Sequence, residues 1–383
     1  MKRREFLTGA VTGAVVAAGA TYAATANRAP LPMEAGTPAA PGQAPAINGG
    51  LHEWKMVTTW PKNFPGAGTA AQDLADTISQ MSGGRLTVKL FAAGEVVPAF
   101  ESFDAVREGT AECAHAAPYY WVAKNKSIPF FCAVPGGLSV IEHNAWILHG
   151  GGQELWDELY GEFGVRGFLA GNTGTQMGGW FQREMNTLDD FKGLKIRIPG
   201  LAAEVLNRMG ATAVNMPAGE IMPALQSGVI DAAEWVGPWV DLTMGFYKVA
   251  KYYYGPGFHE GSTANELLIN ESVWQSLSSD LQAIVRTACQ ELNMRLPAEY
   301  FARSTGALAT LVNEHGVMVK SFPEEVYAEA YRIAAEVNAE TANEGDLNRR
   351  IYESWSAFRK TAMDYQPLSD NGFINNRRRA IQS

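Results

Sequence analysis

Residues 193–238 read GLKIRIPGLAAEVLNRMGATAVNMPAGEIMPALQSGVIDAAEWVGP, and this stretch decides the fold. At its start, three apolar residues alternate with Lys195 and Arg197, as in a half-buried strand, and a Pro-Gly pair then ends the pattern. The following ten residues have helical composition, TAVNMP is strand-like, PALQSG ends a second helix, and VIDAAEW is strand-like again. The stretch therefore predicts repeated β-α-β units.

Four polar residues follow strand-like runs in and around this stretch. Arg197 and Glu234 lie within it, Gln176 precedes it and Glu260 follows it. In open α/β sheets, ligands bind beyond the carboxyl ends of the strands. We therefore expect these four side chains to face one pocket.

These side chains are suited to a small organic acid and a cation. Arginine carries a rigid fork of donors that matches a carboxylate. Glu234 and Glu260 would repel each other and the acid unless a cation lay between them. Their oxygens, with the amide oxygen of Gln176, suit a hard ion. Taken singly, an arginine on a strand is more often a surface or ion-pair residue, and Trp235 is more often a core aromatic than a ligand wall.

The same stretch strongly resembles the solute-receptor subunit of tripartite ATP-independent periplasmic (TRAP) transporters, the DctP family. The resemblance extends over about residues 54–365. Most members carry an asparagine after the strand that matches VIDAAE, whereas this chain has Glu234-Trp235, with Glu260 downstream. In this respect it resembles the TakP-like branch, which binds 2-oxo or 2-hydroxy monocarboxylates together with a metal ion.

The resemblance implies a role for each residue. Arg197 would bind the substrate carboxylate, and Gln176 would give its amide oxygen to the metal or the substrate. Glu234 and Glu260 would ligate the metal, Na⁺ or Ca²⁺, with the backbone carbonyl of Trp235. The family also implies membrane subunits of the transporter as partners.

Two further substrate contacts are expected from the segments before this stretch. Tyr119 or Tyr120, in APYYW, resembles a family contact, and the sequence does not choose between them. Asn172 is also a candidate, although asparagine in a GNTG turn often serves the backbone conformation.

The chain begins with features of an export signal. Arg3 and Arg4 precede a moderately apolar Ala/Gly/Val run and an Ala-Thr-Ala cleavage pattern, which indicates a twin-arginine signal peptide and a periplasmic protein. The whole chain has a net charge of −9, and the signal contributes Lys2, Arg3, Arg4 and Glu5, so the mature chain would carry about −11. This balance disfavours nucleic acid and anionic membranes as partners.

We expect an α/β, two-lobed periplasmic binding protein fold, with a hinge-closed cleft, helices that cross between the lobes and a long C-terminal helical segment. Hydrophobic residues make up 46% of the chain, enough for a large core. The C-terminal helices pack on their own lobes or pair with a second copy to give a homodimer. The expected parts are a signal peptide (1–26), a flexible linker (27–50), a first lobe with a late returning segment (51–163), a second lobe (164–320), long C-terminal helices (321–365) and a tail (366–383), whose end, residues 375–383, is basic and expected to be disordered.

Two other functions remain open from the residues alone. A secreted enzyme acting on small organic acids could use Glu234 and Glu260 as acid and base. An adhesion or sensory module would use the C-terminal helices as its main surface. Cys113 and His115 could form a nucleophile and base, but cysteine beside alanine is usually core. His259-Glu260 lacks the HExxH spacing of a zinc hydrolase. We therefore favour a receptor, not an enzyme.

Overall fold

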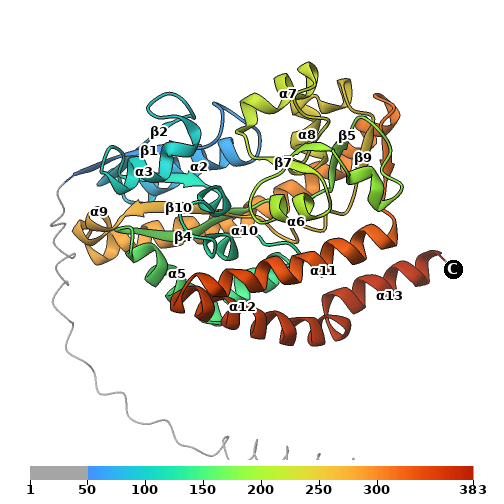
Figure 1. Ribbon diagram of the computed structural model, residues 1–383. Helices are drawn as coiled ribbons and strands as arrows, with labels where there is room; N and C mark the ends of the chain where they lie inside the picture. The colour runs from blue at the N-terminus through green and yellow to red at the C-terminus, as the bar shows by residue number, and fades with distance from the viewer. Residues whose placement is uncertain (1–50, 383) are drawn as a thin grey trace, which may run out of the picture. The chain divides into compact units, whose positions relative to one another are not determined.

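The computed structural model describes residues 51–382, so the predicted signal peptide and linker lie outside the described residues. Two β-sheets form the centre of the fold (Figure 1). The first has the strand order β2-β1-β3-β10-β4 and the second β11-β9-β5-β8-β6-β7. The strands are β1 (His52–Thr58), β2 (Leu86–Phe91), β3 (Cys113–Ala116), β4 (Val165–Asn172), β5 (Gly179–Phe181), β6 (Lys195–Arg197), β7 (Thr212–Val214), β8 (Ala232–Ala233), β9 (Tyr252–Tyr254), β10 (Ala264–Asn270) and β11 (Met318–Lys320).

Helices cover both sheets. The longest helix, α10, packs against β4 and α2 beside the first sheet and against α8 beside the second. It therefore contacts both halves of the fold, each of which is one sheet with its helices. The α-helices are α2 (Ala67–Met81), α3 (Ser102–Arg107), α4 (Val140–His149), α5 (Gly152–Gly161), α6 (Ala202–Arg208), α7 (Ala218–Ser227), α8 (Pro238–Met244), α9 (Glu271–Ser276), α10 (Ser279–Asn313), α11 (Glu324–Glu340), α12 (Asp346–Tyr365) and α13 (Asp370–Gln382). Among the described residues, none of these helices has the length and apolar character needed to cross a membrane.

The predicted β-α-β units are confirmed in the second sheet. Strand β6 pairs in parallel with both β7 and β8, and α6 and α7 connect the three strands. In β6, Lys195 is exposed and Ile196 is buried, as the alternation of basic and apolar residues predicts. Arg197 is buried as well, which the alternation does not predict. The α/β class and the long C-terminal helices are confirmed as well.

With a boundary at residue 163, we expected strand β4 to begin the second lobe. The structure differs. Strand β4 pairs antiparallel with β10 and so belongs to the first sheet. Strand β10 itself lies between β3 and β4, although it follows β5 to β9 in the sequence. The sequence carries no local signal of this long-range pairing, because a strand has the same alternating or continuously apolar residue pattern whichever sheet it joins.

The late strand β11 also differs from expectation. We expected residues 317–323 to return to the first lobe, but β11 pairs in parallel with β9 at the edge of the second sheet. The segment that returns to the first sheet is β10.

The C-terminal tail is not disordered over residues 370–382, which form α13. Asp370 lies in its first turn and Arg379 in its last, and these charges oppose the partial charges at the two helix ends. Phe373 donates its backbone N–H to the carbonyl of Ser369, which starts the helix. The cluster of arginines suggested a solvated tail, whereas arginine is also a good helix former.

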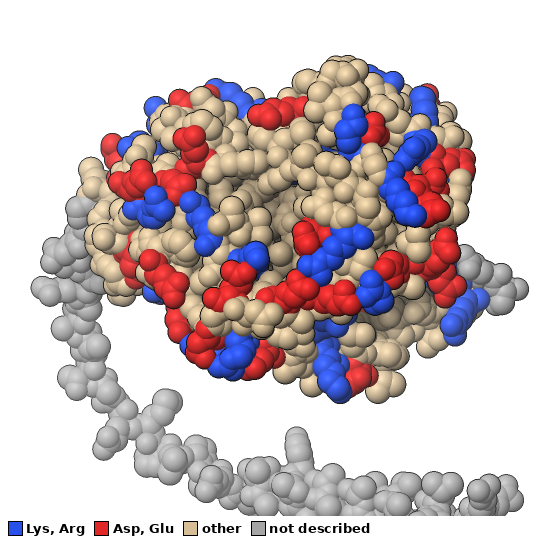
Figure 2. Space-filling model, in the orientation of Figure 1, with Lys and Arg blue, Asp and Glu red and all other residues tan. Residues whose placement is uncertain are grey.

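Ion pairs connect the C-terminal helical segment to α6 and to Lys126. Figure 2 shows one face of the molecule, on which acidic and basic side chains are interspersed around a hollow. Arg208 on α6 pairs with Glu340 at 2.6 Å, and Lys126 pairs with Glu344 at 2.7 Å. A cavity of about 450 Å³ lies between α6, α11 and residues 122–126. The C-terminal helices thus contact segments of both halves.

Candidate functional site

Arg197 is placed by the end of β6 and is almost fully buried, with 1% of its surface exposed. Its Nη1 donates to the backbone carbonyl of Glu234 at 2.8 Å, and its Nε donates to the carbonyl of Met216 at 3.2 Å. The remaining nitrogen, Nη2, is buried and has no partner among residues 51–382. The guanidinium is therefore held by the backbone of its neighbours while one of its donors is left for another group.

Glu234 follows β8 and meets Arg197 because β6 and β8 are parallel neighbours, with Arg197 opposite Ala233. The carboxylate Oε2 lies 3.3 Å from Arg197 Nη1, and Oε1 is buried without a hydrogen-bond partner in the described part of the chain. Burial raises the pKa of Glu234 well above its ordinary value, and the charge of Arg197 offsets part of this rise. A further positive charge near Oε1 would stabilise the ionised carboxylate.

The ring of Trp235 lies against the Arg197 guanidinium, whose central carbon is 4.9 Å from the ring centroid. The backbone that carries Glu234 and Trp235 is fixed by Asp241, whose Oδ1 accepts from the N–H groups of Val236 at 3.2 Å and Gly237 at 3.0 Å. The structure thus gives Trp235 an aromatic contact in the site, in addition to the carbonyl role implied by the family.

Glu260 and Gln176 are joined through Thr263. Gln176 Nε2 donates to Thr263 Oγ1 at 2.9 Å, and Thr263 Oγ1 donates to Glu260. The backbone N–H of Gln176 also donates to the carbonyl of Glu260 at 3.1 Å. The amide oxygen of Gln176 is buried without a hydrogen-bond partner in the described chain. Burial, with Glu234 nearby, raises the pKa of Glu260 to about 8.

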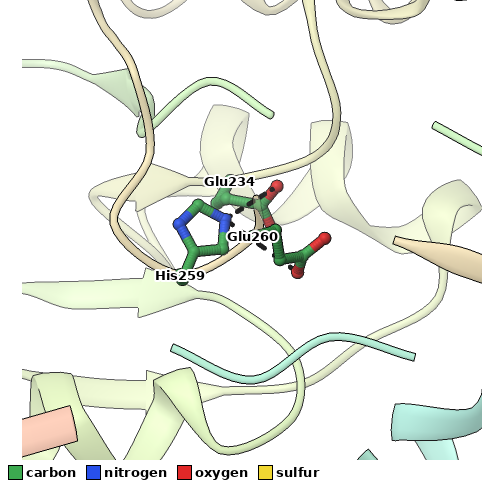
Figure 3. Close-up of side chains that lie close together, drawn as sticks. All are labelled: Glu234, His259 and Glu260. Atoms are coloured by element: carbon green, nitrogen blue, oxygen red, sulfur yellow. Dashed lines mark ion pairs between the residues drawn. The ribbon is translucent and has the colours of Figure 1, made fainter. Parts of the chain in front are cut away.

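His259 lies beside both carboxylates, which the sequence did not predict. Its Nε2 is 3.4 Å from Glu234 Oε1 and 3.9 Å from Glu260 Oε1 (Figure 3). The ring is buried, and burial lowers the pKa of His259. The only sequence signal was its position next to Glu260. Without a spacing typical of metal sites, that signal did not separate a ligand from a core histidine.

Tyr119 and Tyr120 lie in a 3-10 helix, η2 (Pro118–Trp121), and both are buried. Burial raises the pKa of Tyr119 well above its ordinary value, and the charge of Glu260 raises it further. Burial raises the pKa of Tyr120 to about 12, with Arg197 acting in the opposite direction. The charges of the site therefore affect the pKa values of both tyrosines. These effects do not show which of the two is the substrate contact.

Asn172 is engaged with the backbone. Its Oδ1 accepts from the N–H of Gly174 at 2.9 Å and from that of Thr263 at 3.2 Å, which holds the GNTG turn against the segment carrying Glu260. Cys113 and His115 lie elsewhere, buried in the first sheet, where His115 Nδ1 accepts from Trp60 Nε1 at 2.9 Å. The amide nitrogen Nδ2 of Asn172 is buried without a hydrogen-bond partner in the described chain, so the role of Asn172 as a substrate contact stays a prediction. The Cys-His pair is part of the core.

A buried carboxylate, Glu266 in β10, supports the tyrosine segment. It accepts from Trp121 Nε1 at 2.7 Å and from the Tyr160 hydroxyl at 2.9 Å. Burial is the main cause that raises its pKa from 4.5 to about 7, and these two donors offset part of the rise.

This shift predicts a stability that depends on pH. Between pH 4.5 and about 7, folded Glu266 keeps a proton that the unfolded chain has lost, so the free energy of unfolding falls as pH rises, by about 3 kcal/mol in all. Glu266→Gln should remove this contribution, as measured by denaturant unfolding of metal-stripped protein at about pH 5 and pH 8. The exposed Glu53→Gln serves as control and should keep the wild-type slope. An unchanged slope in Glu266→Gln would contradict the assignment.

Comparison with known proteins identifies the family of this chain. Residues 56–344 match the DctP family model, described as bacterial extracellular solute-binding protein, family 7. The chain belongs to the DctP family. It is therefore a solute-binding subunit of the TRAP type, as the sequence predicted, and the enzyme and adhesion alternatives are not supported.

Relatives of this DctP protein cover nearly its full length. A monocarboxylate 2-oxoacid-binding periplasmic protein of Nostoc sp. is 36% identical over 98% of both chains. A TRAP solute-binding protein from Pseudoalteromonas atlantica, solved with sodium and pyruvate, is 36% identical, covers 85% of this chain and 99% of its own, and superposes with a TM-score of 0.82. One from Colwellia psychrerythraea, solved with calcium and pyruvate, is 38% identical with the same coverage and TM-score.

Proposed function

We propose that this protein is the extracytoplasmic receptor that binds a small 2-oxo or 2-hydroxy monocarboxylate, such as pyruvate, bridged to Na⁺ or Ca²⁺. It delivers this ligand to the membrane subunits of a TRAP transporter. One observation carries the proposal: Arg197 Nη2, Gln176 Oε1 and Glu234 Oε1 are all buried without hydrogen-bond partners among residues 51–382. A buried donor and two buried acceptors left unpaired are costly, and a carboxylate with a cation would satisfy all three.

The substrate carboxylate would bind Arg197. Because Nε and Nη1 already donate to backbone carbonyls, the guanidinium is fixed before the ligand arrives. The Trp235 ring on one face of the guanidinium limits its movement further. A pre-oriented donor loses little conformational entropy on binding.

The cation would be held by Glu234, Glu260, Gln176 and the backbone carbonyl of Trp235. These are oxygen donors, and Na⁺ and Ca²⁺ prefer oxygen ligands. When bound, the cation would supply the positive charge that two buried carboxylates and an organic anion require. The relatives solved with pyruvate and with sodium or calcium support the presence of a cation beside the substrate.

Ligand entry requires the site to open. Arg197 ends β6 and Glu234 follows β8, both in the second sheet, whereas Tyr119 and Tyr120 follow β3 of the first. All four are buried, so the described structure corresponds to a closed cleft. The ligand would stabilise this closed form by contacting both halves, with one of the tyrosines completing a site built mainly from the second.

Calorimetric titration of metal-stripped protein tests the proposal. Pyruvate, lactate and longer 2-oxo acids are titrated with and without Na⁺ or Ca²⁺. The expected result is cation-dependent binding at micromolar or tighter affinity. Binding without any cation dependence would remove the metal from the proposal, and the absence of binding to every acid would contradict the receptor function.

Location and assembly extend this proposal. Residues 1–26 would direct export by the twin-arginine route, and the family is extracytoplasmic. The chain would also form a homodimer through its C-terminal helices. A similar protein of Bordetella bronchiseptica was solved as a dimer, and the last helix here, α13, carries exposed apolar residues, among them Phe373 at 66% and Ile381 at 78% exposure.

Substitution of these two residues tests the homodimer. The double variant Phe373→Ser, Ile381→Ser should shift the mass measured by light scattering from that of a dimer to that of a monomer, because the apolar area that drives association is lost. Val229→Ser, at an exposed position between α7 and β8, should leave the mass unchanged. A wild-type protein that is monomeric at all concentrations, or a dimer that survives the double substitution, would contradict pairing through α13.

A further inference from the structure

Two buried threonines hold the amide group of Gln176, and the proposed function gives neither of them a role. Thr173 directly follows β4, and Thr263 directly precedes β10. The two strands are antiparallel neighbours with Asn172 opposite Ala264, and the backbone N–H of Thr173 donates to the carbonyl of Thr263 at 3.0 Å. Gln176 Nε2 donates to the hydroxyl of each threonine, at 2.9 Å in both cases. The pairing of the strands thus brings both hydroxyls to one amide group.

The protons of these two hydroxyls are directed at other acceptors. Thr263 Oγ1 donates to the carboxylate of Glu260, and Thr173 Oγ1 donates to the carbonyl of Gly174 at 3.3 Å. A carbonyl oxygen and an ionised carboxylate only accept hydrogen bonds. Because a hydroxyl has a single proton, each threonine has only its lone pairs left for Gln176.

This pattern fixes which way round the amide of Gln176 lies. Its nitrogen carries two protons, and each of them is donated to one threonine oxygen. Turning the amide over would set Oε1 against two oxygen atoms that have no proton to donate to it. In the observed orientation, Oε1 is buried without a hydrogen-bond partner among residues 51–382. The orientation matters for a cation, because the amide oxygen is a ligand of Na⁺ and Ca²⁺ whereas the N–H groups repel them.

We infer that Thr173 and Thr263 are positioning residues of the cation site, which hold the amide of Gln176 so that its oxygen is the atom available to Na⁺ or Ca²⁺. The inference rests on the proposed function, in which Gln176 Oε1 is a ligand of the cation. Groups that orient a metal ligand typically contribute about 10- to 100-fold to the affinity for the metal. Thr263 contacts two of the proposed ligands, because its hydroxyl also donates to Glu260.

Substitutions at Thr173 separate the hydroxyl from the rest of the side chain. Thr173→Val keeps the shape of the side chain and removes the hydroxyl, whereas Thr173→Ser keeps the hydroxyl and removes a methyl group. The full chain is stripped of metal and titrated calorimetrically with Ca²⁺ in the presence of pyruvate. Thr173→Val should lower the affinity for Ca²⁺ about tenfold, and Thr173→Ser should stay within about threefold of the wild type.

Thr263→Val should cost more than Thr173→Val, about thirtyfold, because it also removes the donor to Glu260. Thr341→Val is the matched control. Thr341 is a buried threonine of the 3-10 helix η6 (Thr341–Glu344), and its hydroxyl donates to the carbonyl of Asn338 at 2.7 Å. This substitution also removes one buried hydroxyl, but it should leave the affinity for Ca²⁺ within about twofold of the wild type.

A double-variant cycle tests whether Thr173 acts through the amide. In a Gln176→Ala background no amide remains to be oriented, so the further substitution Thr173→Val should change the affinity for Ca²⁺ less than about twofold. A further loss of about tenfold in that background would overturn the inference, because the threonine would then act independently of Gln176.

The other outcomes separate the inference from the function on which it rests. Wild-type protein that binds pyruvate with Ca²⁺, together with Thr173→Val of unchanged affinity, would overturn the positioning role and leave the receptor proposal standing. Thr173→Ser that binds Ca²⁺ as weakly as Thr173→Val would also overturn it. The absence of pyruvate binding by the wild type with either cation would overturn both. Circular dichroism checks the fold of each variant, and if Thr263→Val does not fold, the variants of Thr173 decide the question.

Discussion

Arg197→Ala is expected to lower the affinity for pyruvate at least about a hundredfold, equivalent to about 3 kcal/mol of binding free energy. The guanidinium is the buried cation that would pair with the substrate carboxylate, and its Nη2 has no partner among the described residues. Its removal would take away one of the two positive charges proposed to face the ligand carboxylate in a buried site. Calorimetric titration in the presence of Ca²⁺ measures the loss.

Arg208→Ala is the matched control for this prediction. Arg208 lies on α6, the helix that follows the strand of Arg197, but it is paired on the surface with Glu340 and Glu204. Its loss should leave the affinity within about threefold, because exposed ion pairs contribute little. Pyruvate binding by Arg197→Ala at near wild-type affinity would show that the carboxylate is held elsewhere. Circular dichroism of both variants checks that the fold is retained.

Glu234→Gln should lower the affinity for the cation at least about a hundredfold, because a charged ligand is replaced by a neutral one of the same shape. Pyruvate affinity should fall with it, since the two are expected to bind together. Arg197 keeps its 2.8 Å hydrogen bond to the backbone carbonyl of residue 234, so the substitution leaves the strand ends in place. Titration of metal-stripped protein with Ca²⁺, with and without pyruvate, measures both effects.

Glu204→Gln provides the comparison for Glu234→Gln. Glu204 is a partly exposed carboxylate on α6 that pairs with Arg208 at 2.8 Å. Cation affinity should be the same as in the wild type. If Glu234→Gln binds Ca²⁺ as tightly as Glu204→Gln does, Glu234 is not a ligand of the cation, and the proposed donor set is wrong.

The sequence predicted those features that local pattern and strand direction determine. Alternation around Arg197 located β6, and the two following β-α units made β6, β7 and β8 parallel, so the residues after them had to meet at one edge. Glu234 follows β8 and contacts Arg197 for this reason. The individual roles of the site residues came from the family resemblance and remain predictions.

Other features depend on contacts between distant segments, which no local pattern records. In the first sheet, β10 lies between β3 and β4. The lobe boundary that we expected at residue 163 would therefore separate strands of one sheet. His259 enters the cluster because Gly257 and Glu260, on either side of it, are hydrogen-bonded to the backbone of Gln176, and its neighbours in the sequence do not show this. Thr263 links Gln176 to Glu260 in the same way.

The position of β10 also has a consequence for synthesis of the chain on the ribosome. Residues 113–116 and 165–172 emerge early, but their shared neighbour in the sheet, residues 264–270, follows only after most of the second sheet. At ordinary translation rates this delay is on the order of ten seconds. During that time two strand edges stay unpaired, and unpaired edges invite aggregation. In a nascent chain of this protein, β3 and β4 therefore lack their shared neighbour until residue 270 has left the ribosome.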